Sequence, residues 1–155
     1  MKVLVTGNLG YVGNVLTRML LNQKFDVIGC DVGFYPQGFL GLENSGCEQI
    51  KKDIRDLSIE DLKDVSAICH LAALSNDPLG EINSHLTEDI NYKATIRLAK
   101  LAKEANVEKF VFSSSCSSYG MNEKIVNEES ELIPLTAYAK SKVNSERVIS
   151  EISNN

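Results

Sequence analysis

The chain has 155 residues, of which 43% are hydrophobic and 24% are charged, and its formal net charge is −5. One globular domain is expected, because a chain of about this length buries roughly two-thirds of its unfolded surface. The acidic balance disfavours a nucleic-acid or anionic-membrane partner, no apolar run approaches the roughly 18 residues of a membrane span, and no signal-peptide pattern follows Met1, so we expect a cytoplasmic protein.

Short apolar runs alternate with longer amphipathic runs along the chain. The predicted strands are residues 2–6, 25–30, 47–50, 65–71 and 110–113. The predicted helices are residues 11–23, 86–105 and 136–152, where apolar side chains recur at helical spacing. This alternation predicts an α/β fold of the Rossmann type. We expect a doubly wound parallel sheet of strand order 3-2-1-4-5, with helices on both faces in a three-layer α/β/α arrangement.

Three irregular stretches follow the carboxyl ends of predicted strands, where open parallel sheets bind ligands: residues 32–46, 75–84 and 116–135. The loop 75–80 is expected to face a substrate. The cysteines show no paired or metal-like spacing, so we expect small buried thiols and no metal site. They are Cys30, Cys47, Cys69 and Cys116.

A glycine motif joins the first predicted strand to the first predicted helix. Gly7 permits a tight turn, Gly10 lets a pyrophosphate approach the backbone, and Gly13 lets helix and strand pack closely. The helix N-terminus supplies amides and a partial positive charge for the phosphates. Asp31 ends the next strand, where a carboxylate can bind both ribose hydroxyls of NAD and repel the extra phosphate of NADP. The sequence therefore favours NAD, with an unliganded glycine turn as the alternative.

A tyrosine and a lysine stand four residues apart near the end of the chain, so Tyr138 and Lys142 share one face of the predicted helix. A lysine ammonium near a phenol favours the phenolate. Such a phenol can exchange a proton with a sugar hydroxyl while a hydride moves to or from a nicotinamide. Ser115 follows the fifth predicted strand and can hydrogen-bond the same hydroxyl. The Tyr/Lys spacing alone is common on surface helices, and its combination with Ser115 and the glycine motif favours catalysis.

Together these motifs resemble the extended short-chain dehydrogenase/reductase family, the nucleotide-sugar epimerases and dehydratases. The resemblance extends over nearly the whole chain, and the segments that carry it are residues 7–13, Asp31, 53–56, 70–73, Asn91, 113–120 and 138–142. It implies an enzyme that uses NAD on a nucleoside-diphosphate sugar, with Ser115, Tyr138 and Lys142 as catalytic residues. The residues that it implies at the cofactor are Gly7, Gly10, Tyr11, Val12, Gly13, Asp31, Asp53, Ile54, Leu71, Ala72, Ala73, Ser113, Tyr138 and Lys142.

The resemblance also implies roles for residues around these motifs. Asp53 and Ile54 are expected at the adenine. Asn91 is expected behind the active site, or else as a solvated or capping residue. His70 is expected to be a packed strand residue and His85 a surface residue. A homodimer is implied through the helices that contain Asn91 and Tyr138. Its candidate contacts are Leu98, Leu101 and Val143, whose alternative is packing on their own sheet.

Two features depart from the family pattern. The dehydratase branch carries an Asp-Glu pair after its catalytic Ser/Thr, whereas this chain has Cys116 and Ser117. Epimerase, reductase or decarboxylase chemistry is therefore favoured over elimination. Family members also run to roughly twice this length. We therefore expect residues 1–155 to be a single NAD-binding domain, truncated before the C-terminal substrate lobe or standing alone.

Two other functions remain open from the sequence. One is an NAD-binding module without turnover, because nothing in residues 1–155 is expected to enclose a sugar or exclude water. On that ground we expect this chain alone to bind cofactor and to turn over little or no sugar. The other is a redox-sensing scaffold that acts through Cys116.

Overall fold

A computed structural model of the chain describes residues 1–34, 46–75 and 77–154. The chain divides into two compact units. The first, here the sheet unit, comprises Met1–Ala72 and Arg97–Ser113, and the second, here the helical unit, comprises Ala73–Ile96 and Ser114–Asn155. Most of the predicted irregular stretch 32–46 lies outside the described residues. Within the described part, no helix is long and apolar enough to cross a membrane.

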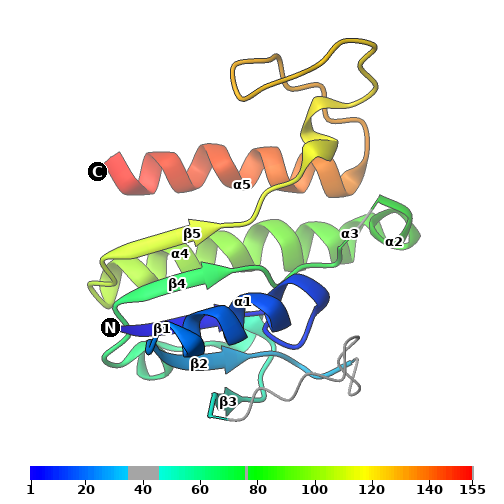
Figure 1. Cartoon of the computed structure of the whole chain (residues 1–155). Helices are drawn as coiled ribbons and strands as arrows, with labels where there is room; N and C mark the ends of the chain where they lie inside the picture. Colours follow the sequence, from blue (N-terminus) through cyan, green and yellow to red (C-terminus); the bar gives the residue numbers. More distant parts are fainter. Residues whose placement is uncertain (35–45, 76, 155) are drawn as a thin grey trace. The chain divides into compact units, whose positions relative to one another are not determined.

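The sheet unit contains one five-stranded sheet in which every pair of neighbours is parallel (Figure 1). Its order, β3-β2-β1-β4-β5, confirms the predicted topology. The strands are β1 Lys2–Thr6, β2 Asp26–Cys30, β3 Glu48–Ile50, β4 Ala67–His70 and β5 Lys109–Phe112. Because parallel strands end at the same edge, this topology brings the segments after β1, β2 and β4 together at their carboxyl ends.

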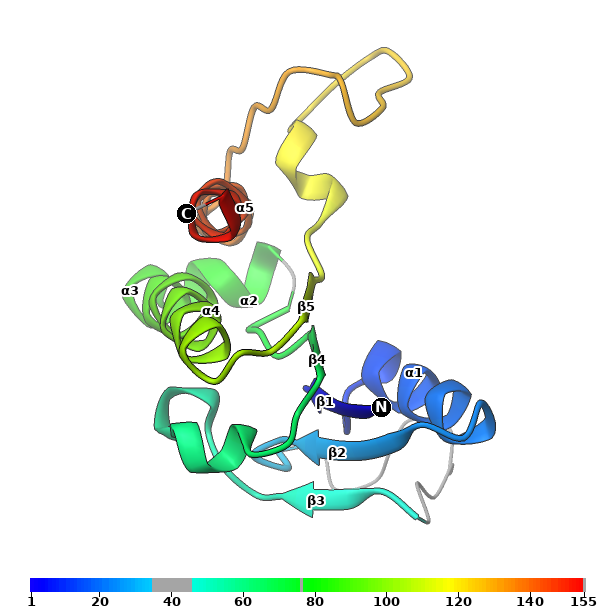
Figure 2. The same cartoon turned by 90° about the vertical axis from the view of Figure 1, so that its left-hand side faces the viewer.

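Helices cover both faces of this sheet, as predicted. Figure 2 shows α1, Tyr11–Asn22, on one face and α4, Ala94–Glu104, on the other. On the α1 face, Leu16 and Leu20 pack against a buried cluster that includes Val3 and Val5 of β1. Leu98 of α4 is fully buried within the chain. Of its two predicted roles, packing in its own fold is therefore the correct one.

The helical unit departs from the predicted elements in two places. Residues 77–82, predicted as irregular, form helix α2, Asp77–Ile82. Proline at position 78 is compatible with this helix, because its missing amide costs nothing in the first turn. The predicted helix 86–105 begins earlier and is irregular, with α3 at Ser84–Thr87 and a π-helix, η3, at Glu88–Lys93 before α4.

The remaining elements of the helical unit carry the sequence motifs. A short 3₁₀ helix, η4, spans Cys116–Tyr119, and the long helix α5 spans Ala137–Asn154, close to the predicted 136–152. All four cysteines are free thiols. Cys30 is buried, but Cys116 is exposed, so the expectation of small buried thiols is wrong for Cys116. Its position at the start of η4, after the last strand, places it outside the apolar core.

Candidate functional site

The glycine motif forms a tight turn between β1 and α1. Gly7 has a φ of +74°, which favours glycine, and its amide donates to the Cys30 carbonyl at 2.8 Å. A Cβ on Gly13 would lie 2.0 Å from the Gly7 carbonyl oxygen, so only glycine fits there. Gly10 is the N-cap residue of α1 and has no side chain to bind the first amides of the helix. Those amides therefore remain available to an anion such as a pyrophosphate.

A pair of side-chain amides, one buried and one exposed, holds this turn against the sheet edge, and the sequence motifs did not reveal it. Asn8 is fully buried, and its Nδ2 donates to Gln49 Oε1 of β3 at 2.8 Å. In return, Gln49 Nε2 donates to Asn8 Oδ1 at 3.2 Å. Gly29 of β2 makes room for this contact, because a Cβ there would lie 2.2 Å from Asn8 Nδ2.

The Asp31 carboxylate follows β2 and binds the glycine turn directly. Its Oδ2 accepts from the Leu9 amide at 3.3 Å and its Oδ1 from the Gly33 amide at 2.8 Å. Each carboxylate oxygen has a second lone pair, so two further donors can still bind. A vicinal pair of ribose hydroxyls presents two such donors.

The segment predicted to meet the adenine begins with Asp53, which caps a short 3₁₀ helix, η1, Ile54–Asp56. Its Oδ1 accepts from the Arg55 amide and its Oδ2 from Arg55 Nη2, both at 2.9 Å. The hydrogen bond with the Arg55 side chain is the main reason that the pKa of Asp53 lies below its usual value. Ile54 is buried, so it supports the segment from the core and presents little side-chain surface to a ligand.

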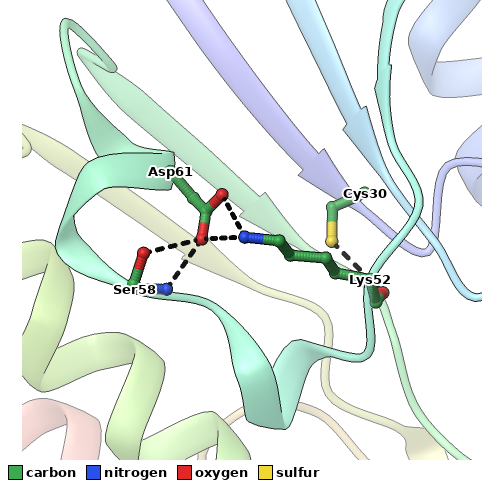
Figure 3. A network of polar contacts seen from close by, with 4 residues as sticks. All are labelled: Cys30, Lys52, Ser58 and Asp61. Carbon is green, nitrogen blue, oxygen red and sulfur yellow. Dashed lines mark hydrogen bonds and ion pairs between the residues drawn. The ribbon is translucent and has the colours of Figure 1, made fainter.

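A polar network fixes this segment to β2 and to a second 3₁₀ helix, η2, Ile59–Leu62 (Figure 3). Lys52 Nζ donates to both Asp61 oxygens, at 2.7 and 2.9 Å, and Ser58 donates to the same carboxylate through its amide and its hydroxyl. Burial opposes ionisation of Asp61, but these bonds outweigh it and lower its pKa. The Cys30 thiol donates to the Lys52 carbonyl, and burial raises its pKa to about 12, so Cys30 remains protonated.

The segment after β4 closes onto the glycine turn. A Cβ on Gly7 would lie 2.7 Å from the Ala72 amide nitrogen and 3.0 Å from the Leu71 carbonyl carbon, so the backbone of both residues lies against the glycine turn. His70 is 1% exposed and its Nδ1 lies 2.6 Å from Thr6 Oγ1, which confirms the prediction of a packed strand residue. Tyr11 and Val12 are exposed at the start of α1 in this sheet unit.

Two further predicted cofactor residues flank the boundary between the units. Ser113 belongs to the sheet unit, where its amide donates to the His70 carbonyl at 3.1 Å. Ala73 belongs to the helical unit and is half-buried. The amide–carbonyl bond places Ser113 in register with the end of β4.

The helical unit brings the predicted Tyr/Lys pair together on α5. Lys142 Nζ lies 5.7 Å from the centre of the Tyr138 ring, close enough for a cation–π contact. Lys142 is 3% exposed, and this burial lowers the pKa of its ammonium to about 8, with the Glu146 carboxylate opposing part of the shift. Tyr138 is half-buried. The prediction that the two side chains share a helix face is confirmed.

Ser115, the third predicted catalytic residue, is the N-cap of η4 in the same unit. Its Oγ accepts from the Ser117 amide at 3.2 Å. The Ser117 hydroxyl donates to an Asp77 oxygen of α2 at 3.0 Å, so a carboxylate binds one of the two positions where the dehydratase branch carries its acidic pair. Asp77 was not among the predicted site residues.

Asn91 is 1% exposed within the π-helix η3, so neither the solvated nor the capping alternative is correct. Its side chain binds the backbone of Leu74 on both sides, accepting from the amide at 2.8 Å and donating to the carbonyl at 3.1 Å. Its own carbonyl accepts from Ser145 of α5 at 3.2 Å. Asn91 thus joins the segment after β4 to the helix that carries Tyr138. His85 is exposed, as predicted.

Comparison with known proteins identifies relatives over the whole chain. Residues 3–155 match the family described as the NAD dependent epimerase/dehydratase family. A UDP-glucose 4-epimerase of Lactobacillus helveticus is 31% identical over 154 residues, which cover 96% of this chain and 46% of that protein. The chain thus spans about half the length of the curated relatives that it matches.

Solved structures show the same likeness in three dimensions. A UDP-glucuronic acid 4-epimerase from Bacillus cereus, in complex with UDP-glucuronic acid and NAD, matches with a TM-score of 0.88 and 28% identity, over 100% of this chain and 53% of that one. A dTDP-glucose 4,6-dehydratase from Streptomyces venezuelae, solved with NAD, matches with a TM-score of 0.86 and 29% identity, over 96% and 50%. Both epimerases and dehydratases therefore share this fold.

Proposed function

The chain belongs to the NAD dependent epimerase/dehydratase family, and we propose that it supplies the cofactor-binding and catalytic residues of an NAD-dependent epimerase or oxidoreductase of nucleoside-diphosphate sugars. The observation that carries the proposal is Lys142, buried at 3% exposure beside the Tyr138 ring. Burying a lysine is costly, so its place next to a phenol is better explained by chemistry than by packing.

The residues of the sheet unit fit a dinucleotide. The turn at Gly7 and Gly13 leaves no space for a Cβ, and the first amides of α1 have no capping side chain. These features suit a pyrophosphate. The free lone pairs of Asp31 suit ribose hydroxyls, and its negative charge disfavours a 2′-phosphate, which supports NAD over NADP.

In the proposed reaction, bound NAD supplies a nicotinamide that accepts and returns a hydride. Tyr138 takes the proton from the sugar hydroxyl as the acid/base residue. Lys142 favours the ionised phenol through its positive charge and holds the nicotinamide ribose. Its pKa of about 8 leaves the ammonium largely protonated at neutral pH. Ser115 orients the sugar hydroxyl through its Oγ.

Epimerisation or oxidoreduction is favoured over elimination of water. The residues that follow Ser115 are Cys116, which is exposed, and Ser117, whose hydroxyl donates to Asp77. Neither provides a carboxyl group of its own at the positions where dehydratases carry an Asp-Glu pair. This distinction concerns the net reaction and leaves the Tyr138 step unchanged.

The test is Tyr138→Phe in the full-length protein, with UDP-glucose as the trial substrate. We expect NAD affinity, measured by calorimetry, to change little, and turnover to fall by about 10²–10⁴-fold, the usual effect of losing general acid–base catalysis. Tyr92→Phe, in the π-helix η3, is the matched control and should behave like wild type. Unchanged turnover in Tyr138→Phe would remove Tyr138 from the mechanism. Wild type that binds NAD and turns over no sugar would support the alternative, an NAD-binding module.

We also propose a homodimer formed through the helices that carry Asn91 and Tyr138. Leu101 and Val143 are half-buried and offer apolar surface, whereas Leu98 does not. Light scattering at micromolar concentration should give twice the mass of the chain, and a monomer would contradict the proposal. A single NAD-binding domain over residues 1–155 and a cytoplasmic location likewise remain proposals from the sequence.

A further inference from the structure

One carboxylate in the helical unit binds both segments that carry the proposed catalytic residues. Asp77 Oδ2 accepts from the Ser117 hydroxyl at 3.0 Å, and Asp77 Oδ1 accepts from the Thr136 hydroxyl. Ser117 lies in η4, directly after Ser115 and Cys116, whereas Thr136 precedes α5. Along the chain, the loop from residue 120 to 135 separates these two segments, and the Ile133 amide of that loop donates to the Ser118 carbonyl of η4 at 2.9 Å.

The bonds continue from Asp77 toward each proposed catalytic side chain. On one side, the Ser117 amide donates to Ser115 Oγ at 3.2 Å. On the other, Thr136 Oγ1 accepts from the Ala139 amide at 3.1 Å and so caps the first turn of α5, next to Tyr138. Because the Thr136 hydroxyl donates to Asp77, a lone pair of its oxygen faces the Ala139 amide. Ser117, in contrast, binds Ser115 through its backbone amide and Asp77 through its hydroxyl. The carboxylate therefore sets the direction of both hydroxyls.

Helix α2 contacts the start of α5, so a displacement of α2 would also displace the first turn of α5. A Cβ on Gly80 would lie 3.0 Å from the Tyr138 Cβ, and Glu81 Oε1 accepts from the Ala137 amide at 2.6 Å. The Thr87 hydroxyl donates to the Gly80 carbonyl at 2.8 Å and fixes α2 on α3. The helix that carries Asp77 is thus fixed by contacts with both α3 and α5.

We propose that Asp77 is a positioning residue that fixes Ser115 and Tyr138 relative to one another through Ser117 and Thr136. The inference rests on the proposed function for its effect on turnover. It applies to a residue that neither binds the cofactor nor exchanges the proton. Displacing a catalytic group by about 1 Å can cost 10²-fold in rate, so a tie of this kind matters for turnover.

Asp77→Asn is the informative variant because it keeps the size of the side chain. A carboxylate accepts from both hydroxyls, whereas an amide offers one oxygen and one NH₂ group, so one hydroxyl loses its acceptor. In the full-length protein, we expect kcat for UDP-glucose conversion to fall by about 10–100-fold, with the KM values for sugar and NAD within about threefold of wild type. Glu123→Gln, an exposed carboxylate of the same unit, is the control for charge removal.

Variants that remove one hydrogen bond at a time separate a positioning role from a general effect on stability. Ser117→Ala removes the bond between Ser117 and Asp77, and Thr136→Val removes the bond between Thr136 and Asp77. If Asp77 acts through these two bonds, the double variant Asp77→Asn/Ser117→Ala should lose much less kcat than the two single variants combined. Additive losses in kcat would overturn the proposal, because they would mean that Asp77 does not act on Ser115 through Ser117. A rise in KM with kcat unchanged would also overturn it, because the catalytic groups would then still be correctly placed.

Hydrogen exchange decides the same question without turnover. In Asp77→Asn, the amides of Ser118 in η4 and Ala139 in α5 should both exchange faster, whereas Ser117→Ala should affect only the first and Thr136→Val only the second. If either amide kept its wild-type protection in Asp77→Asn, the proposal that Asp77 holds both segments would be overturned. Faster exchange with wild-type kcat would show a structural bond without catalytic effect and would also overturn the proposal. An inactive full-length wild type would contradict the proposed function alone, because the exchange pattern still tests whether Asp77 holds the two segments.

Discussion

Asp31 is the residue on which the choice of cofactor depends. Its oxygens bind the amides of Leu9 and Gly33, so the carboxylate is oriented before any ligand arrives. Preorganisation of this kind lowers the cost of ordering the carboxylate when a ribose binds. Because its second lone pairs remain available, the geometry supports two charge-assisted bonds to ribose hydroxyls.

We expect Asp31→Ala to weaken NAD binding by about 10–100-fold, corresponding to about 1.5–3 kcal/mol for the lost ribose contacts. NADP binding should fall less, because the carboxylate that repels its extra phosphate is also removed, so the preference for NAD narrows. Calorimetry with both cofactors provides the measurement. Asp26→Ala, at the opposite and exposed end of β2, is the matched control. Tighter binding of NADP than of NAD by wild type would contradict the assignment.

Single residues divide into those that the sequence could indicate and those that it could not. The glycine turn, Asp31, Ser115, Tyr138 and Lys142 were predicted because short motifs place them. Asn8 and Asp77 were missed because their partners are distant in the chain. Gln49 lies 41 residues from Asn8, and Thr136 lies 59 residues from Asp77. No local pattern reports a hydrogen bond formed over such a separation.

At the scale of elements, strand β3 acts on the glycine turn through Gln49. Asn8 is fully buried, and its side-chain amide forms two hydrogen bonds with the Gln49 side chain, at 2.8 and 3.2 Å. An amide left without a partner in the interior costs about 1–3 kcal/mol. The edge strand therefore supports the turn that the pyrophosphate is proposed to bind.

We expect Gln49→Leu to lower the free energy of unfolding by about 1–2 kcal/mol, because the Asn8 amide is left unsatisfied. NAD affinity should fall several-fold as the turn loosens. Urea denaturation and NAD titration measure the two effects. Glu48→Gln, the exposed neighbour in β3, should change neither. If Gln49→Leu matched wild type in both measurements, the amide pair would have no role in holding the turn.

Helices and strands could be predicted where hydrophobic periodicity determines the secondary structure. They could be predicted less well where tertiary contacts determine it. All five strands and their order followed from apolar runs alternating with helices. Helix α2 did not, because Asp77 and Pro78 are equally typical of turns. The π-helix η3 did not either, and it contains Asn91, whose side chain binds the backbone of Leu74, 17 residues away.

At the scale of the whole molecule, the buried Lys142 couples function to stability. Its ammonium is 3% exposed, and burial lowers its pKa from 10.5 to about 8. The unfolded chain keeps the proton up to about pH 10.5, whereas the folded chain releases it near pH 8. Between these values the unfolded state binds more protons, so the contribution of Lys142 to folding stability rises with pH. At neutral pH the folded protein must accommodate a buried charge.

We therefore expect Lys142→Met to raise the free energy of unfolding at pH 7 by about 1–3 kcal/mol, since a shift of one pKa unit corresponds to about 1.4 kcal/mol. The difference from wild type should shrink as the pH rises from about 8 to about 10.5, because wild-type Lys142 is then neutral as well. Lys140→Met, on the exposed side of α5, should show no such pH-dependent gain. Urea denaturation of the three proteins across this range tests the prediction. A variant less stable than wild type at pH 7, or a difference that does not change with pH, would mean that burial of Lys142 carries no charge penalty. The gain in stability should come with a loss of turnover, because the same ammonium is proposed to tune Tyr138.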